Sequence, residues 1–255
     1  MSHQPSAQYI DDVNAQPGST SPAETPWWRG LPSQCAVCRG WGRGRICGTC
    51  TRRFAPPADR CRRCAIRVPP GVGTCGNCVR SSPPFDSALA AVDYAHPWDR
   101  LIADLKFNDA LDLVGSMSDL LIAAHRQHPA VHPDLMLPVP LGPRRLRERG
   151  YNQSWELARR CARTMGCQTE PALLLRIRDT PHQLSLARGQ RVANVRGAFA
   201  VDPTRRAELK GRTITLIDDV MTTRATAAEL TRVLLDAGAI AVHVWVVART
   251  PSPGH

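Results

Sequence analysis

Apolar and polar positions follow two alternating periods along the chain from Phe85 onward. Short apolar runs bounded by Pro and Gly alternate with stretches of helical spacing, a pattern typical of a parallel sheet covered by helices. We therefore expect an α/β fold in this part of the chain. The pattern predicts strands over residues 89–94 and 135–139, and helices over residues 98–107, 111–126 and 153–164.

The clearest unit lies near the C-terminus. An apolar strand is predicted over residues 213–217, a polar loop over 218–225, and an amphipathic helix over 226–237 that Gly238 ends. A second apolar strand follows over 241–248, which completes one βαβ unit. The loop then lies at the carboxyl end of its strand, where α/β proteins bind ligands.

The residues of this loop suit a phosphorylated sugar. It reads Asp218, Asp219, Val220, Met221, Thr222, Thr223, Arg224, Ala225 and Thr226. Backbone N–H groups and the positive end of the following helix can hold a phosphate, and the Thr hydroxyls add donors. The carboxylates can accept from sugar hydroxyls directly or through hydrated Mg²⁺. The alternative is that the two acids and the threonines only cap a turn and a helix.

Cysteine spacing predicts a separate module before this domain. Eight of the ten cysteines form four C-x-x-C pairs, separated by 8, 10 and 10 residues: Cys35 and Cys38, Cys47 and Cys50, Cys61 and Cys64, Cys75 and Cys78. Two such pairs complete a tetrahedral Cys₄ zinc site, so we expect two structural zinc ions in two consecutive ribbons. The segment has few other residues to bury and should be largely unfolded without metal.

The chain has a formal charge of +11, and the cysteine module contributes much of it, with ten Arg against Asp59 in residues 35–80. One interpretation is a contact surface for nucleic acid or protein; the other is that the arginines neutralise the thiolates of the zinc sites. Redox chemistry fits less well, because a redox C-x-x-C usually stands once at a helix start. Cys161 and Cys167 are expected to be buried apolar residues with no role in a site.

The remaining features bound the organisation of the chain. Residues 1–26 are polar and lack the apolar region of a secretory signal, so they predict a disordered tail. No stretch reaches the roughly 20 apolar residues of a membrane span. We expect a cytoplasmic protein, where reduced thiols favour metal binding. The predicted domains are the tail 1–26, a double zinc ribbon over 27–82, and the α/β domain over 83–255.

The strand, Asp-Asp-x-x-Thr-Thr-x-Ala-Thr loop and helix resemble the phosphoribosyl pyrophosphate signature of type I phosphoribosyltransferases. The chain from about residue 35 to 250 is similar to the ComF family of competence-associated proteins. The similarity rests on the paired cysteines, Leu105-Lys106-Phe107, Pro138 to Leu141, Arg144 to Gln153, Gln183-Leu184, Arg191, Asn194 and Gly197-Ala198-Phe199. It implies a type I phosphoribosyltransferase-like parallel sheet with helices on both faces, preceded by the zinc-ribbon module.

The resemblance also implies roles for individual residues. Asp218 and Asp219 would address the ribose hydroxyls of Mg²⁺-bound phosphoribosyl pyrophosphate, and the 5′-phosphate would lie against Thr222, Thr223, Arg224, Ala225 and Thr226. The loop over 140–149 lies at a second carboxyl edge, so Arg144 and Arg147 are expected to bind pyrophosphate. They are equally compatible with a solvated basic helix start.

One position departs from the family pattern, which has Gly where this chain has Arg224. If the backbone there is left-handed, a side chain costs roughly 1–2 kcal/mol and either blocks the phosphate or folds over it.

Three functions follow from the resemblance and the charge. The first is a protein that binds phosphoribosyl pyrophosphate in DNA uptake or processing, contacting single-stranded DNA and DNA-uptake proteins, with Trp27, Trp28 and Trp41 available to stack on bases. The second is an active phosphoribosyltransferase with a mobile lid over residues 177–192. The third is a sensor in which the sugar phosphate changes how the zinc module meets a partner.

Overall fold

The computed structural model describes residues 32–127, 132–178 and 195–251. The predicted tail, Trp27, Trp28 and most of the predicted lid lie outside these residues. The described chain from Pro32 onward belongs to one unit, so the cysteine module and the α/β domain contact each other directly.

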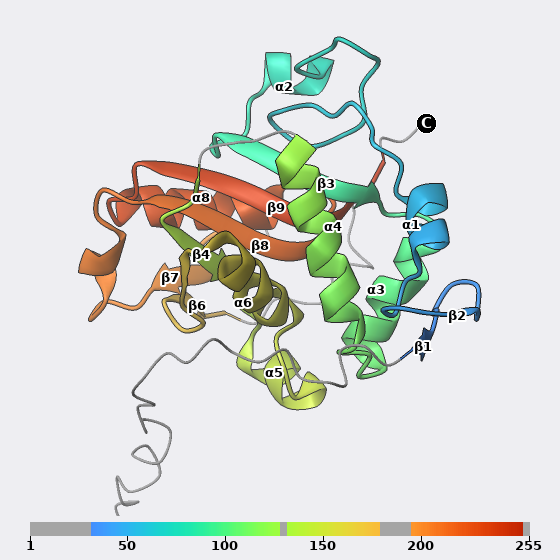
Figure 1. Ribbon diagram of the computed structural model, residues 1–255. Helices are drawn as coiled ribbons and strands as arrows, with labels where there is room; N and C mark the ends of the chain where they lie inside the picture. Colours follow the sequence, from blue (N-terminus) through green and yellow to red (C-terminus); the bar gives the residue numbers. More distant parts are fainter. Residues whose placement is uncertain (1–31, 128–131, 179–194, 252–255) are drawn as a thin grey trace, which may run out of the picture. The chain divides into compact units, whose positions relative to one another are not determined.

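A five-stranded parallel sheet forms the centre of this unit (Figure 1). Its order is β3-β9-β8-β4-β5, and all four neighbouring pairs are parallel. The strands are β3 (Ser87–Asp93), β4 (Leu135–Pro138), β5 (Gln168–Thr169), β8 (Thr213–Met221) and β9 (Ala241–Arg249). The predicted α/β class is confirmed.

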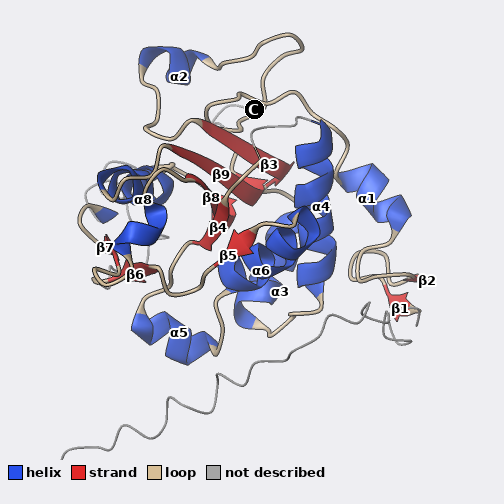
Figure 2. Cartoon of the chain, turned by 60° about the vertical axis from the view of Figure 1, so that its left-hand side comes forward, coloured by secondary structure: helices blue, strands red, loops and turns tan. Residues whose placement is uncertain are grey.

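Helices cover both faces of the sheet (Figure 2). On one face, α3 (Trp98–Phe107), α4 (Leu113–Gln127) and α6 (Gln153–Met165) pack in a core that includes Trp245 and Val247 of β9. On the other face, α8 (Ala225–Asp236) packs in a core with Val244 and Val246. Because successive residues of β9 point to opposite buried faces, the strand reads as one continuous apolar run.

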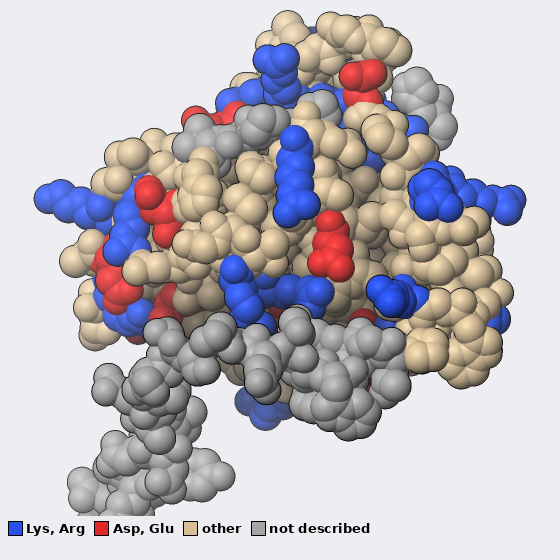
Figure 3. Space-filling view, viewed as in Figure 1, with Lys and Arg blue, Asp and Glu red and all other residues tan. Residues whose placement is uncertain are grey.

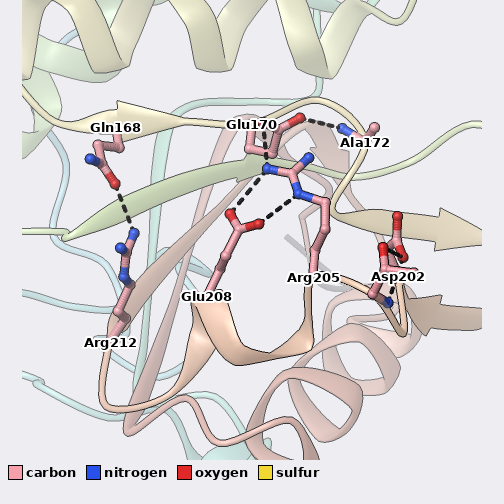
Figure 4. A network of polar contacts seen from close by, with 8 residues as sticks. Gln168, Glu170, Ala172, Asp202, Arg205, Glu208 and Arg212 are labelled. Atoms are coloured by element: carbon pink, nitrogen blue, oxygen red, sulfur yellow. Dashed lines mark hydrogen bonds and ion pairs between the residues drawn. The ribbon is translucent and has the colours of Figure 1, made fainter.

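Several short elements were not predicted. They are α5 (Pro143–Arg149), the antiparallel pair β6 (Leu174–Arg176) and β7 (Phe199–Val201), and the 3₁₀ helix η5 (Arg206–Leu209). Arg205 binds Glu170 at 2.9 Å and Glu208 at 2.6 Å, and Arg212 donates to Gln168 at 2.8 Å (Figure 4). This network lies beside the amino ends of β5 and β8, away from the edge where the phosphate loop was predicted.

The cysteine module consists of β1 (Ser33–Gln34) and β2 (Trp41–Gly42), α1 (Gly48–Phe54) and α2 (Gly76–Arg80). Each helix begins directly after a cysteine of the second C-x-x-C pair of its ribbon, Cys47 or Cys75. The first ribbon packs on the α/β domain: Cys35 and Cys50 are buried in the same core as Trp98 of α3. In addition, the indole N–H of Trp98 donates to the carbonyl of Phe54 at 2.7 Å.

Candidate functional site

The acidic pair stands on the last residues of β8. This strand is four residues longer than the predicted 213–217, because its backbone continues to pair with β9 as far as Met221 opposite Arg249. The prediction that Asp218 begins a loop was therefore wrong. The polar side chains had suggested a strand end, but they sit on regular strand backbone at the carboxyl edge of the sheet.

Asp219 is almost completely buried, with 3% of its surface exposed. Its Oδ1 pairs with Nζ of Lys106 on α3 at 2.9 Å. Burial alone would lower the pKa of Lys106, but the neighbouring Asp219 carboxylate outweighs it and raises the pKa. The buried Oδ2 of Asp219 has no hydrogen-bond partner among the described residues. One carboxylate oxygen is therefore available for a cation or a ligand hydroxyl.

Asp218 is held by hydrogen bonds to a single oxygen. Its Oδ1 accepts from Oγ of Ser154 at 3.0 Å and from the backbone N–H of Asp219 at 2.9 Å. Burial, followed by the charge of Asp219, raises the pKa of Asp218 to about 7. Asp218 therefore holds its proton up to near neutral pH, and a bound divalent cation would favour its ionised form. This arrangement fits Mg²⁺, which prefers carboxylate oxygens together with those of a substrate.

The segment after α5 places Ser154 beside the acidic pair. Gly150, with φ of 78°, ends α5 in the left-handed conformation that glycine adopts without strain. Asn152 then caps α6 by accepting from the Ser154 N–H at 3.0 Å, and its own amide donates to Val139 at 3.1 Å. The sequence analysis gave Ser154 and Lys106 no role. In the sequence, a role for these two residues is indicated only by their position. Each lies in or next to a segment on which the resemblance to the ComF family rests.

The predicted phosphate loop, residues 222–226, comprises the connection between β8 and α8 and the first two residues of α8. Helix α8 begins at Ala225, so Thr226 lies in its first turn, and Arg224 is the N-cap residue. Arg224 has φ of 70° and thus takes the left-handed conformation. Its guanidinium Nη1 donates to Sγ of Cys78, 3.3 Å away. The side chain is thus held at the cysteine module.

The acidic pair and the phosphate loop border one cavity of about 480 Å³, within the range of small-molecule sites. Lys106, Arg145 and Arg149 also line it. Arg144 and Arg147 are not among the lining residues, although Arg144 pairs at 2.7 Å with Glu148, which does line the cavity. The α5 arginines that line the cavity are therefore Arg145 and Arg149, not the two expected from the sequence.

The eight paired cysteines form two groups, the first Cys₄ site (Cys35, Cys38, Cys47 and Cys50) and the second Cys₄ site (Cys61, Cys64, Cys75 and Cys78). In each group the sulfurs lie within 4.8 Å of one another. The Sγ atoms of Cys38 and Cys47 are 3.8 Å apart, and those of Cys64 and Cys75 are 3.7 Å apart. Tetrahedral zinc with Zn–S near 2.3 Å requires a separation of about 3.8 Å. Both groups therefore fit a zinc ion, and the predicted grouping is confirmed.

The thiols of each group differ in their surroundings. Although burial acts against it, backbone N–H groups lower the pKa of Cys35 to about 6 and that of Cys61 to about 7. Burial and the neighbouring sulfurs raise the pKa of Cys50 and Cys78. Four thiolates at this distance repel one another, so a divalent cation is needed to hold them all deprotonated.

Several arginines of the module bind acids of the α/β domain, a role that the sequence analysis did not consider. Arg45 pairs with Asp112 at 2.6 Å, and Arg60 and Arg67 both pair with Asp93, Arg60 at 2.7 Å. Part of the Arg excess therefore ties the module to the domain. Among the described residues of the module, the arginines that are exposed and outside these pairs are Arg39, Arg43, Arg52, Arg53, Arg62 and Arg80.

Among the residues that the structure describes, no helix is both long and apolar enough to cross a membrane.

Comparison with solved structures gives distant similarities. A glutamine phosphoribosylpyrophosphate amidotransferase from B. subtilis is 22% identical with a TM-score of 0.33, covering 52% of this chain. This chain spans only 25% of that amidotransferase chain. A purine phosphoribosyltransferase from Pyrococcus horikoshii Ot3 is 15% identical with a TM-score of 0.33, covering 54% of this chain and 82% of its own. The strand order and the parallel register of the sheet define the fold of this chain.

Comparison with curated proteins gives matches over most of the chain, whereas no family model matches. The DNA utilization protein YhgH of Escherichia coli (strain K12) is 33% identical over 227 residues, which cover 86% of this chain and 98% of that protein. Competence protein F of Haemophilus influenzae is 28% identical over 223 residues, which cover 85% and 96%. This chain therefore belongs to the ComF family, the family of YhgH and competence protein F.

Proposed function

We propose that this protein binds phosphoribosyl pyrophosphate, or a similar sugar phosphate, together with Mg²⁺, and acts in DNA uptake or processing in the cytoplasm. The observation that carries the proposal is the convergence of the acidic pair and the phosphate loop on one cavity. The names of the relatives, a DNA utilization protein and a competence protein, support the DNA-related role.

Each part of the cavity has a task in this proposal. Asp218 and Asp219 accept from the ribose hydroxyls, with Mg²⁺ supplying positive charge to the pyrophosphate oxygens when it is bound. The backbone N–H groups and hydroxyls of residues 222–226 hold the 5′-phosphate at the N-terminus of α8. Arg145 and Arg149 then replace Arg144 and Arg147 as the proposed cations for pyrophosphate, since they line the cavity.

The first prediction is that the wild-type protein binds phosphoribosyl pyrophosphate despite Arg224. Its side chain is directed to Cys78 and need not occupy the phosphate position. Calorimetric titration with Mg²⁺ should give binding by both the wild type and Arg224→Gly, with the affinity of the variant lower by no more than about tenfold, roughly 1.4 kcal/mol. Binding by the glycine variant alone, or by neither protein, would contradict the proposal.

A second candidate function is an active phosphoribosyltransferase. The cavity extends to Tyr94 and Phe107, and the Phe107 ring is 64% exposed with the Arg149 guanidinium 5.3 Å from its centre. An exposed aromatic ring at the mouth of the cavity suits a planar acceptor such as a nucleobase. Pyrophosphate release that depends on added nucleobase would favour this function over ligand binding alone.

The proposed DNA contact involves the first ribbon of the module. Trp41 is 74% exposed and stands between Arg39 and Arg43, so it is free to stack on a base, not packed inside the module. Basic side chains are spread over the face seen in Figure 3, with neutral surface and several acidic side chains among them. This distribution favours a few phosphate contacts over one continuous basic track.

The second prediction concerns Trp41→Ala. It should weaken binding of oligothymidylate about tenfold, because one base–aromatic stack contributes about 1–3 kcal/mol. The salt dependence should remain unchanged, since the arginine–phosphate contacts persist. Fluorescence anisotropy at several salt concentrations measures both quantities. Ile240→Ala, which truncates another exposed apolar residue, is the matched control. Equal affinities of the two variants would rule out stacking by Trp41.

A further inference from the structure

Two arginines of the α/β domain link the second Cys₄ site to the phosphate loop. Arg249 is the last residue of β9 and is 5% exposed. Its Nη1 donates to the carbonyls of Met221 and Thr222 at 2.8 and 2.7 Å, and its Nε donates to the carbonyl of Cys64 at 2.9 Å. The buried Arg249 side chain therefore binds two backbone segments at once. One is the start of the phosphate loop, and the other is Cys64, a member of the second Cys₄ site.

Arg224 makes the second link, from the other end of the loop. It occupies a left-handed backbone conformation that disfavours a side chain by about 1–2 kcal/mol. Such a conformation persists only where the surroundings hold it. The Nη1–Sγ contact with Cys78 is one such restraint.

Packing connects the same two regions. Ala65 follows Cys64 directly, is fully buried, and belongs to the core cluster that contains Met221 and Ala227. The first Cys₄ site packs elsewhere, in the core formed by α3, α4 and α6. The two cysteine sites therefore have different neighbours, and only the second has these ties to the phosphate loop among the described residues.

We propose that Arg224 and Arg249 are positioning residues that couple the second Cys₄ site to the phosphate loop. Zinc in the second site fixes the carbonyl and the sulfur that the two arginines bind, and so fixes both ends of the loop. A sugar phosphate in the loop then raises the affinity of the second Cys₄ site for zinc, and zinc raises the affinity for the sugar phosphate by the same factor, because coupling between binding free energies is reciprocal. Tighter zinc binding is expected to appear as slower loss of zinc from this site. The ligand half of this inference rests on the proposed function.

The test without ligand uses the zinc-loaded full-length protein. A chelator selective for zinc over Mg²⁺ is added with a thiol-alkylating reagent, and peptide mass spectrometry follows alkylation of each cysteine. In Arg224→Gly, alkylation at the second Cys₄ site should be at least about fivefold faster than in the wild type. The first Cys₄ site is the internal control and should change less than twofold. Equal acceleration at both sites, or at neither, overturns the role of Arg224.

The glycine variant makes this result specific to coupling. Glycine relieves the left-handed strain at position 224, so general destabilisation does not explain faster zinc loss from one site. Arg232→Gln is the matched control, since it removes an exposed cation from the same helix, α8. It should leave alkylation at both sites unchanged.

The ligand arm repeats the measurement with phosphoribosyl pyrophosphate and Mg²⁺. In the wild type the ligand should slow alkylation at the second site about fivefold or more, and this protection should disappear in Arg224→Gly although the variant still binds. Binding without protection in the wild type overturns the coupling and leaves the proposed function intact. Absence of calorimetric binding refutes the proposed function, while the ligand-free arm still decides the role of Arg224.

Arg249→Lys provides an independent variant. It keeps the charge but cannot bind carbonyls of the loop and of Cys64 in the same planar arrangement. The variant should accelerate alkylation at the second site selectively, as Arg224→Gly does. Unchanged alkylation in Arg249→Lys overturns the contribution of Arg249.

Discussion

Replacing Cys35 with Ser is expected to lower the melting temperature of the whole protein by about 10 °C or more. Zinc sites of this kind contribute strongly to folding, and losing one ligand forfeits part of roughly 10–16 kcal/mol. The loss is not confined to the ribbon, because Cys35, Ile46 and Cys50 are buried in the core that contains Trp98. Each kcal/mol corresponds to about 2–4 °C in a domain of this size. Calorimetry of the zinc-loaded proteins gives the measurement.

Cys167→Ser is the matched control for this effect. Cys167 is a free, partly buried cysteine outside both Cys₄ sites, so its replacement should shift the melting temperature by only a few degrees. Near-ultraviolet circular dichroism should also report a changed environment of Trp98 in Cys35→Ser. If both variants melt together, the first Cys₄ site does not support the core of the α/β domain.

This integration of module and domain was not evident from the sequence. Cysteine spacing predicted the two Cys₄ groups correctly, because a C-x-x-C turn brings two sulfurs together whatever lies around it. It says nothing about which surface the ribbons cover. The expectation that the module unfolds alone without metal treated it as separate, whereas Trp98 and Asp112 of the domain bind Phe54 and Arg45 of the module.

Regular elements were the part of the fold that the pattern predicted best. The helix over 98–107 was predicted with the bounds of α3, because a long amphipathic repeat specifies its own range. Helix α6 differs from its prediction by one residue at its C-terminal end, and α8 by one residue at each end. Helix α5 was left open only as a solvated basic helix start, without bounds, since seven residues without a buried side chain carry no such repeat. The sequence did not place the start of α5 at Pro143. It therefore could not indicate which arginines of this segment face the cavity.

The candidate site was predictable only where it is local in sequence. Asp218, Asp219 and residues 222–226 form one continuous motif, so their proximity follows from the βαβ unit. Lys106 and Ser154 come from α3 and α6, more than 60 residues away along the chain, and reach the pair through tertiary packing. Pattern reasoning had no means of assigning them a carboxylate partner.

Asp218→Asn is expected to stabilise the protein above pH 7 while removing most of its affinity for phosphoribosyl pyrophosphate. Burial and Asp219 raise the pKa of Asp218 to about 7, so ionisation disfavours the folded state. In the wild type, the contribution of Asp218 to stability falls as pH rises from its unfolded pKa near 3.8 through its folded pKa of about 7. At 1.36 kcal/mol per pH unit this loss is at most about 4 kcal/mol, and about 2 kcal/mol after solvent screening.

Asparagine keeps the acceptor oxygen for Ser154 and for the Asp219 N–H, so it mimics the protonated acid without new packing. The variant and the wild type should melt alike below pH 4 and separate by about 4–8 °C at pH 8. Asp202→Asn is the control of opposite sign, because hydrogen bonds from Thr204 lower the pKa of Asp202. It should lower stability slightly, or leave it unchanged, at pH 8.

Ligand affinity should respond to the same titration. In the wild type it should rise from pH 6 to pH 8, as the carboxyl group loses its proton and can accept from a ribose hydroxyl or bind Mg²⁺. Asp218→Asn should bind about 10- to 100-fold more weakly at pH 8, because a hydrogen bond to a charged group contributes about 1.5–3 kcal/mol. A variant that gains stability and keeps its affinity would show that Asp218 is a strained residue with no part in binding. The opposed effects on stability and affinity are what separates a ligand-binding carboxylate from one that only caps a turn.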